Sequence, residues 1–311
     1  MSTSKLRDWL DTIDSYGMQR VIFHKALFIA TMLVFGYWIL QPPNLLAYIA
    51  PIFVMRLDEI PGTHVRQREK RMYFIFAMVL LCSMSFYVLF PFKFIFLFYS
   101  IIIFTLIYIA TLYFYPELKT SITLIFMDGI LFVSAGSDAD LQTAYNIFSS
   151  MVLSMIIIFT CIKIFPGYYQ FIWRRATILL LTRLAQQMDD TLHNRLTSYF
   201  YEEVTHLNVM RCYCKLLPLA QLRHALKITH QVRKVQFITS TLHYDKINQP
   251  FWHETILCLR HIKHAMQTNH VCSITHIMSY PVQTKLQQAA MQYITSIIHH
   301  WNSLCALRKN A

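Results

Sequence analysis

The sequence predicts an all-α polytopic membrane protein with six transmembrane helices followed by a cytoplasmic helical bundle. Of its 311 residues 55% are hydrophobic and only 14% are charged, and the apolar residues are concentrated between Val21 and Pro166. No segment shows the apolar–polar alternation that is typical of a β-strand. We expect an amphipathic interfacial helix over residues 1–20, a transmembrane domain over 21–167 and a basic α-helical domain over 168–311.

The first segment has the spacing of an amphipathic helix. Its apolar face, at i, i+3, i+4 and i+7 spacing, consists of Leu6, Trp9, Leu10, Ile13, Tyr16 and Gly17. The basic and acidic side chains of this segment balance, so we expect apolar burial, rather than attraction to anionic lipid, to hold it on a membrane surface.

Six apolar stretches with short connections follow. The predicted spans are 21–40, 44–57, 72–90, 94–115, 120–136 and 144–165, of which the second and fifth are short for a bilayer. The loop at 58–71 carries most of the basic side chains, whereas the opposite loops contain Lys93 as their single lysine or arginine. Because basic loops stay in the cytoplasm, this asymmetry predicts six spans with both termini cytoplasmic.

The second half is helical in pattern and strongly basic. Residues 172–311 contain 16 Lys and Arg against 6 Asp and Glu, a net charge of +10, and helix breaks are expected near Asn194, Pro218, Pro250 and Pro281. About five helices should form a bundle. The basic residues are dispersed and no nucleic-acid-binding motif is present, so apposition to anionic membrane lipid is favoured over nucleic acid. The seven cysteines show no paired framework and are expected to be reduced.

Asp128 is the first candidate for a functional residue. It lies eight residues into the fifth predicted span, about 12 Å along a helix, and is followed by Gly129. An ionisable group at mid-membrane costs at least a few kcal/mol, so such groups usually face a cavity or a partner and can carry protons. Alternatively, Asp128 caps a locally broken helix or bonds to Ser and Thr side chains on neighbouring spans.

The second predicted span contains Pro51 in its middle and ends at Arg56. Short, interrupted spans often form transporter binding sites because their half-helix ends offer unpaired backbone groups. An ordinary proline kink explains the pattern equally well.

Basic side chains gather near the predicted inner mouth. Beyond Arg56, the cluster consists of Arg66, Arg68, Lys70 and Arg71. These groups could draw anionic substrates or lipid to the mouth, although positive-inside topology alone accounts for them. Lys25, near the inner end of the first span, either extends to the membrane surface or faces a pore.

No cofactor, metal site or enzymatic activity is predicted. Twelve of the 14 histidines lie in residues 172–311, including the pairs His261/His264 and His299/His300, but no companion spacing completes a metal site. The thiols of Cys212 and Cys214 would point to different sides of a helix. Phosphate-binding Gly loops, nucleophile elbows and zinc-protease helices are also missing from the sequence.

Several local motifs resemble the fusaric-acid-resistance (FUSC) superfamily, which includes aromatic-acid exporters. They are Gln41-Pro42-Pro43 before a short span ending at Met55-Arg56, Pro61-Gly62-Thr63 before a basic run, and Phe165-Pro166-Gly167-Tyr168 before Arg174-Arg175. The family commonly has a Gly-rich third span, whereas Tyr73 to Phe90 contains no Gly. The resemblance implies a single-half member that needs a homo-oligomer to rebuild a pore, and a periplasmic adaptor of the membrane-fusion type as partner.

Three functions follow as hypotheses. The first is a bacterial inner-membrane transporter subunit that exports small organic or aromatic acids or toxic compounds, with Asp128 as the coupling or gating residue and Arg56 near the inner entrance. The second is a passive anion channel, for which basic groups at the mouth would suffice. The third is a membrane scaffold whose basic helical domain recruits a cytoplasmic partner.

Overall fold

The computed structural model divides the chain into two compact units. One contains Gln19–Ile60 and His64–Pro166, and the other contains Met1–Met18, Pro61–Thr63 and Gly167–Ala311. The residues whose structure is described are 9–10, 12–54, 65–134, 140–165, 168–195, 200–242, 247–273 and 281–309. Within these ranges the chain forms α-helices and one 3-10 helix, and no strand, as the sequence predicts.

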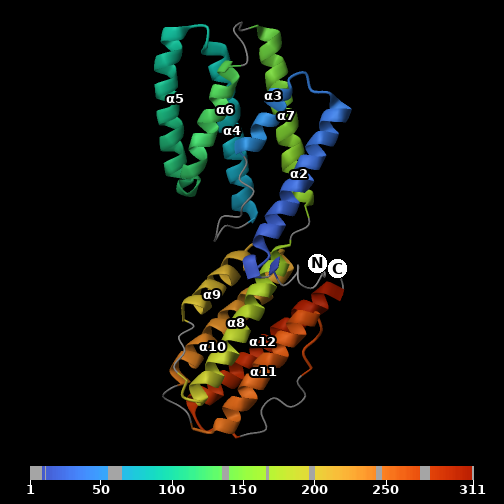
Figure 1. Ribbon diagram of the computed structural model, residues 1–311, viewed down its shortest axis with the longest axis vertical. Coiled ribbons are helices and arrows are strands. Elements are labelled where there is room, and N and C mark those ends of the chain that lie inside the picture. Colours follow the sequence, from blue (N-terminus) through green and yellow to red (C-terminus); the bar gives the residue numbers. More distant parts are fainter. Residues whose placement is uncertain are drawn as a thin grey trace. The chain divides into compact units, whose positions relative to one another are not determined.

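Six α-helices make up the described part of the first unit, which we call the membrane unit. They are α2 (Met18–Leu40), α3 (Leu45–Val54), α4 (Val65–Leu89), α5 (Lys93–Phe114), α6 (Ile122–Ser134) and α7 (Leu141–Ile164), with the 3-10 helix η1 (Pro116–Ser121) before α6. Successive helices alternate in direction (Figure 1). The connections between helices therefore fall alternately at the two ends of the unit.

Four of these helices are long and apolar enough to cross a membrane. They are Met18–Leu40, Gln67–Leu89, Lys93–Phe114 and Leu141–Ile164, and they coincide with the first, third, fourth and sixth predicted spans. The other two, α3 and α6, have 10 and 13 residues. At 1.5 Å per residue they are about 15 and 20 Å long, less than the hydrocarbon thickness of about 30 Å. Helix length thus supports four crossings of the six predicted.

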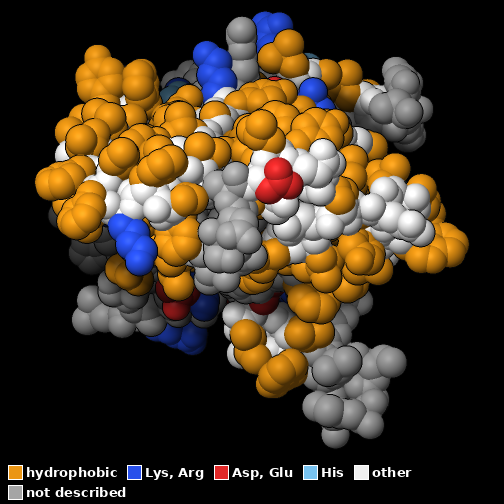
Figure 2. Space-filling view, turned by 90° about the horizontal axis from the view of Figure 1, so that it is seen from above, with side chains coloured by type: hydrophobic (Ala, Val, Ile, Leu, Met, Phe, Trp, Pro, Cys, Tyr) orange, Lys and Arg blue, Asp and Glu red, His pale blue; other side chains and the backbone are white. Residues whose placement is uncertain are grey.

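Helices α3, α4, α6 and α7 pack against one another, whereas α2 and α5 expose most of their surface. Only 17% of the apolar window of α2 and 11% of that of α5 is buried, compared with 44% for α4 and for α7. The exposed side chains of α5 include Phe94, Phe98 and Tyr113. Figure 2 shows that the face seen from above is largely hydrophobic. Contiguous apolar surface on this scale marks contact with lipid or with other protein.

In the described residues after α7, the second unit, which we call the bundle, contains five helices. They are α8 (Tyr169–Leu192), α9 (Phe200–Cys214), α10 (Leu219–Thr241), α11 (Gln249–Thr268) and α12 (Lys285–Lys309). Pro218 is the N-cap of α10, and α11 has a proline in its first turn, where the missing N–H of proline is tolerated. The helix breaks expected near these prolines are therefore present.

Three tryptophans fill the core of the bundle and are completely buried: Trp173, Trp252 and Trp301. The indole Nε1 of Trp173 donates to Thr229 Oγ1 at 3.1 Å, and that of Trp301 donates to the carbonyl of His270 at 2.9 Å. Buried indole groups usually require such partners. The bundle thus has a hydrophobic core of its own, in which two of the three buried indole N–H groups are hydrogen-bonded and that of Trp252 has no partner among the described residues.

The segment before α2 belongs to the same compact unit as the bundle. Tyr16 packs against the bundle core, and its hydroxyl lies 2.6 Å from His206 Nδ1. Gly17 has φ 78°, a left-handed conformation that interrupts the helix predicted over residues 1–20. Trp9 and Ile13, from the same predicted apolar face, are exposed. Residues 1–8 and 11 lie outside the described part, so the interfacial helix stays a prediction.

Candidate functional site

Asp128 lies inside the membrane unit, on the face of α6 that packs against α4. Asp128 is buried, with only 1% of the residue exposed. Ser83 Oγ on α4 donates to Asp128 Oδ2 at 3.4 Å, a long hydrogen bond. The other oxygen, Oδ1, has no hydrogen-bond partner among the described residues. The carboxyl group is thus buried with only one of its two oxygens hydrogen-bonded among the described residues.

Gly129 allows α6 to approach α4 at this point. A Cβ atom added there would lie 2.6 Å from Cys82 Sγ and 3.3 Å from the ring of Phe86. Both distances are shorter than normal van der Waals contact, so a larger residue would push the two helices apart. Asp128 and Gly129 were predicted from the sequence, whereas their neighbours Cys82, Ser83 and Phe86 were not. Small residues at 82 and 83 opposite a glycine were the available signal.

Pro51 is buried within the short helix α3 and does not end it. Because proline lacks an N–H, the carbonyl of Ala47 loses its usual helical donor. At the start of α3, Asn44 Oδ1 accepts from the N–H of Ala47 at 2.9 Å, while the N–H of Asn44 donates to Ser150 Oγ at 3.2 Å. Both interpretations of Pro51, binding site and ordinary kink, are compatible with this arrangement.

The predicted basic residues differ in how far the structure buries them. Lys25, the eighth residue of α2, and Arg71, the seventh of α4, are buried at 5% and 6% exposure, whereas Lys70 is exposed and Arg68 is half-buried. Lys25 thus lies within protein surroundings instead of extending outward. Helix direction places these residues toward the same end of the membrane unit (Figure 1). Arg56 and the side chain of Arg66 lie outside the described residues.

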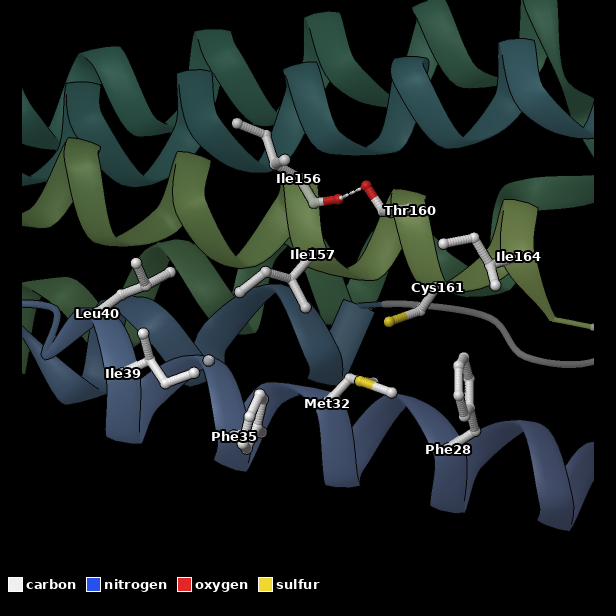
Figure 3. Close-up of a pocket in the computed structure, with 11 residues that line it drawn as sticks. Phe28, Met32, Phe35, Ile39, Leu40, Ile156, Ile157, Thr160, Cys161 and Ile164 are labelled. Atoms are coloured by element: carbon white, nitrogen blue, oxygen red, sulfur yellow. Dashed lines mark hydrogen bonds between the residues drawn. The ribbon is translucent and has the colours of Figure 1, made fainter.

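An apolar groove of about 380 Å³ lies between α2 and α7 (Figure 3). Gly36 contributes to its wall, and Thr160 is turned back to donate to the carbonyl of Ile156 at 2.8 Å. The remaining lining residues are Phe28, Met32, Phe35, Ile39, Leu40, Ile157, Cys161 and Ile164. None of the predicted site residues lines this groove, and it offers no charged group to a carboxylate. An acyl chain or another helix fits its chemistry better than an organic acid does.

Histidines of the bundle meet between α10 and α12. His224 Nδ1 and His300 Nδ1 are 3.4 Å apart, and the ring of His299 lies 5.2 Å from that of His300. Within the described parts of the chain no group of three or more His, Cys, Asp or Glu is close enough to hold a metal ion. The pair is therefore better described as an ionisable contact between two helices than as a metal centre.

Burial holds the pKa of both histidines below the ordinary value of 6.5, and the neighbouring Arg223 and Lys227 lower it further, as does His299. The folded bundle therefore binds fewer protons than the unfolded chain below pH 6.5, so the free energy of unfolding should fall as the pH decreases from there. Thermal unfolding of the full chain in detergent, followed by circular dichroism at pH 7.5 and 5.5, should show a lower midpoint at pH 5.5.

The double variant His224→Gln/His300→Gln should lose part of that difference. His230→Gln, which changes an exposed histidine of α10, should retain it and is the matched control. Burial raises the pKa of Glu203, so this residue changes the free energy of unfolding with pH in the opposite direction. Its contribution is the same in all variants and cancels when they are compared. Equal acid sensitivity in the wild type and the double variant would exclude the pair as its source.

Taken together, the four apolar helices and the buried carboxyl group define an α-helical membrane protein with an ionisable group in its helical core. Comparisons of the chain with protein-family models, with curated proteins and with solved structures found no match. The function must therefore be argued from the residues themselves.

Proposed function

We propose that this protein is a subunit of a bacterial inner-membrane transporter that exports small organic or aromatic acids or toxic compounds. The observation that carries the proposal is the buried Asp128, with one oxygen free of partners among the described residues. Structural carboxylates in membranes normally satisfy their bonding capacity, whereas coupling carboxylates must gain and lose a proton. The substrate class rests on the resemblance to the FUSC superfamily.

Six membrane crossings belong to this proposal, with both termini in the cytoplasm. The alternating helix directions support them (Figure 1), although α3 and α6 are short. Short helices reach only part of the way through a bilayer and leave helix ends at membrane depth, where they are tolerated if they line a water-filled cavity. Ions and substrates would then meet polar backbone groups near Asp128.

A homo-oligomer is part of the proposal because the groove between α2 and α7 of one copy offers no charged group. This groove is apolar, and α2 and α5 expose long apolar faces. Copies packed through such faces would enclose a shared pathway. A periplasmic adaptor of the membrane-fusion type would extend this pathway, as the family resemblance implies.

Flux measurements on the purified full-length protein in liposomes test the proposal. A pH gradient should drive a labelled aromatic acid against its own gradient, and a protonophore should abolish this transport. Protein-free liposomes under the same gradient correct for leakage of the neutral acid. Accumulation no greater than in protein-free liposomes, at verified reconstitution, would contradict the proposal.

A passive anion channel is the second candidate, favoured by the basic residues buried near one end of the membrane unit, Lys25 and Arg71. In the same liposomes a channel would pass anions down their gradient regardless of protonophore. The scaffold hypothesis, in contrast, requires no flux in either condition together with a stable protein partner of the bundle.

A further inference from the structure

In the part of the bundle that the structure describes, one side is basic and contains no carboxylate. Helices α10 and α12 pack against each other, and neither contains an Asp or Glu. The described acidic residues of this unit that follow α7 lie on α8, α9 and α11: Asp189, Asp190, Glu202, Glu203 and Glu254. The acidic residues are therefore confined to the side formed by α8, α9 and α11. This segregation is not evident from the order of the helices along the chain.

The acidic side is largely neutralised within the protein. Arg183 Nε lies 2.7 Å from Glu202 Oε2, and Asp190 has Arg195 Nη1 at 3.8 Å. None of the ion pairs found in the described part of the bundle includes a residue of α10. The basic side chains of α10 are therefore available to bind anionic groups outside the bundle.

The outer face of α10 also carries large apolar side chains. Leu219, Leu226 and Phe237 are 85%, 42% and 68% exposed. At 100° per residue these three positions lie within about 20° of one another around the helix, opposite the buried side that contains Ile228 and Val232. The first and last of them are 18 positions apart, or about 27 Å along α10.

Basic side chains are interleaved with this apolar row. Arg223 and Arg233 are exposed beside it, as are Lys227 and His230. Lys234 reaches across to α12, with its Nζ 4.8 Å from the centre of the Tyr293 ring. A long row of exposed apolar residues bordered by cations, without anions, is the pattern of helices that lie in the interface of anionic membranes.

We propose that the outer face of α10 is a docking surface for the anionic phospholipid headgroups of the bilayer that the same chain enters. Lipid headgroups supply the negative charge that the face lacks, and acyl chains accommodate Leu226 and Phe237. Only four residues separate the end of α7 at Ile164 from the start of α8 at Tyr169, so a bilayer is present at high effective concentration. This inference does not depend on the transport proposal.

Two other occupants fit the face less well. A second copy docking through the same face would bring Arg223 and Arg233 of both copies together. Neither α10 nor α12 has a carboxylate that could neutralise this repulsion. A nucleic acid would use the basic residues but leave three large apolar side chains in water. Lipid satisfies both kinds of side chain.

The test places a nitroxide spin label on α10 of the full-length chain in lipid nanodiscs. Cys212→Ser removes the cysteine that is partly exposed, since the other six are buried, and Phe237→Cys supplies the labelling site. Collision with dissolved oxygen, which concentrates in lipid, is compared with collision with a water-soluble nickel chelate. We expect the oxygen-to-nickel ratio at position 237 to rise several-fold when zwitterionic lipid is partly replaced by anionic phosphatidylglycerol.

Leu257→Cys on α11 is the matched control, because Leu257 is an exposed leucine at 51% on a helix that carries Glu254. Its ratio should not depend on lipid charge. The double substitution Arg223→Gln/Arg233→Gln should reduce the rise at position 237, as should high salt. A label at 237 that stays in water in both lipids would overturn the proposal. Spin–spin broadening between labelled copies without oxygen exposure would overturn it in favour of a second copy.

Discussion

Asp128→Asn should abolish proton-coupled export while the folded protein remains as stable as the wild type or becomes more stable. Asn has nearly the same shape but cannot release a proton. A buried carboxyl group with one unsatisfied oxygen gives up a costly charge when it is replaced, so unfolding on heating should not begin earlier. The accumulation of labelled acid in liposomes should fall to the level of protein-free liposomes.

Asp140→Asn is the control for this change. Asp140 is exposed at the start of α7, so the same loss of charge there should leave export unaffected. Asp128→Glu keeps an ionisable group and should retain part of the coupling. If Asp128→Asn instead lowered the unfolding temperature and left coupling intact, the residue would be a structural cap or hydrogen-bond partner, as the alternative interpretation holds.

Gly129→Leu should separate α6 from α4 and destabilise the membrane unit. Even a Cβ would lie 2.6 Å from Cys82 Sγ, and a leucine needs three further carbon atoms in the same place. Overpacking of this kind typically costs about 1–3 kcal/mol. The unfolding midpoint in detergent should fall, and export should fall with it because Asp128 moves away from Ser83.

The smaller change Gly129→Ala tests the contact itself. Cys82→Ala removes the sulfur atom that the new methyl group meets, so the double variant should recover stability lost by Gly129→Ala alone. A coupling of this kind is expected only for residues in contact. Ile130→Ala, at the adjacent exposed position, should have little effect. Wild-type stability of Gly129→Leu would mean that α6 and α4 are not held as closely as the structure indicates.

Local sequence was sufficient for the helices and for the identity of the ionisable residue. Four spans could be predicted because a membrane helix satisfies its own backbone and needs about 20 apolar residues. Breaks at Pro218 and Pro250 followed from the missing N–H of proline. Asp128 could be identified from the sequence because an ionisable residue in an apolar segment costs free energy to bury, whichever helix it packs against.

Which helices face each other could not be predicted in the same way. In the membrane unit most helix surfaces are apolar, so periodicity does not distinguish a face toward lipid from one toward protein. The pairing of Asp128 with Ser83 joins residues 45 positions apart. The short helices α3 and α6 were expected because the second and fifth apolar stretches of the sequence are short. Whether they cross the membrane depends on the helices packed around them, which helix length does not define.

The sequence by itself determined that this chain is helical, that its apolar residues form helices of membrane-spanning length and that its basic residues accumulate in the second half. Only the tertiary structure decided that Gly129 holds Asp128 against α4, that Tyr16 packs on the bundle, and that α10 and α12 share a side without carboxylates. The physical reason is that helix formation depends on neighbours within four residues, whereas charge segregation and close helix approach depend on contacts between distant segments.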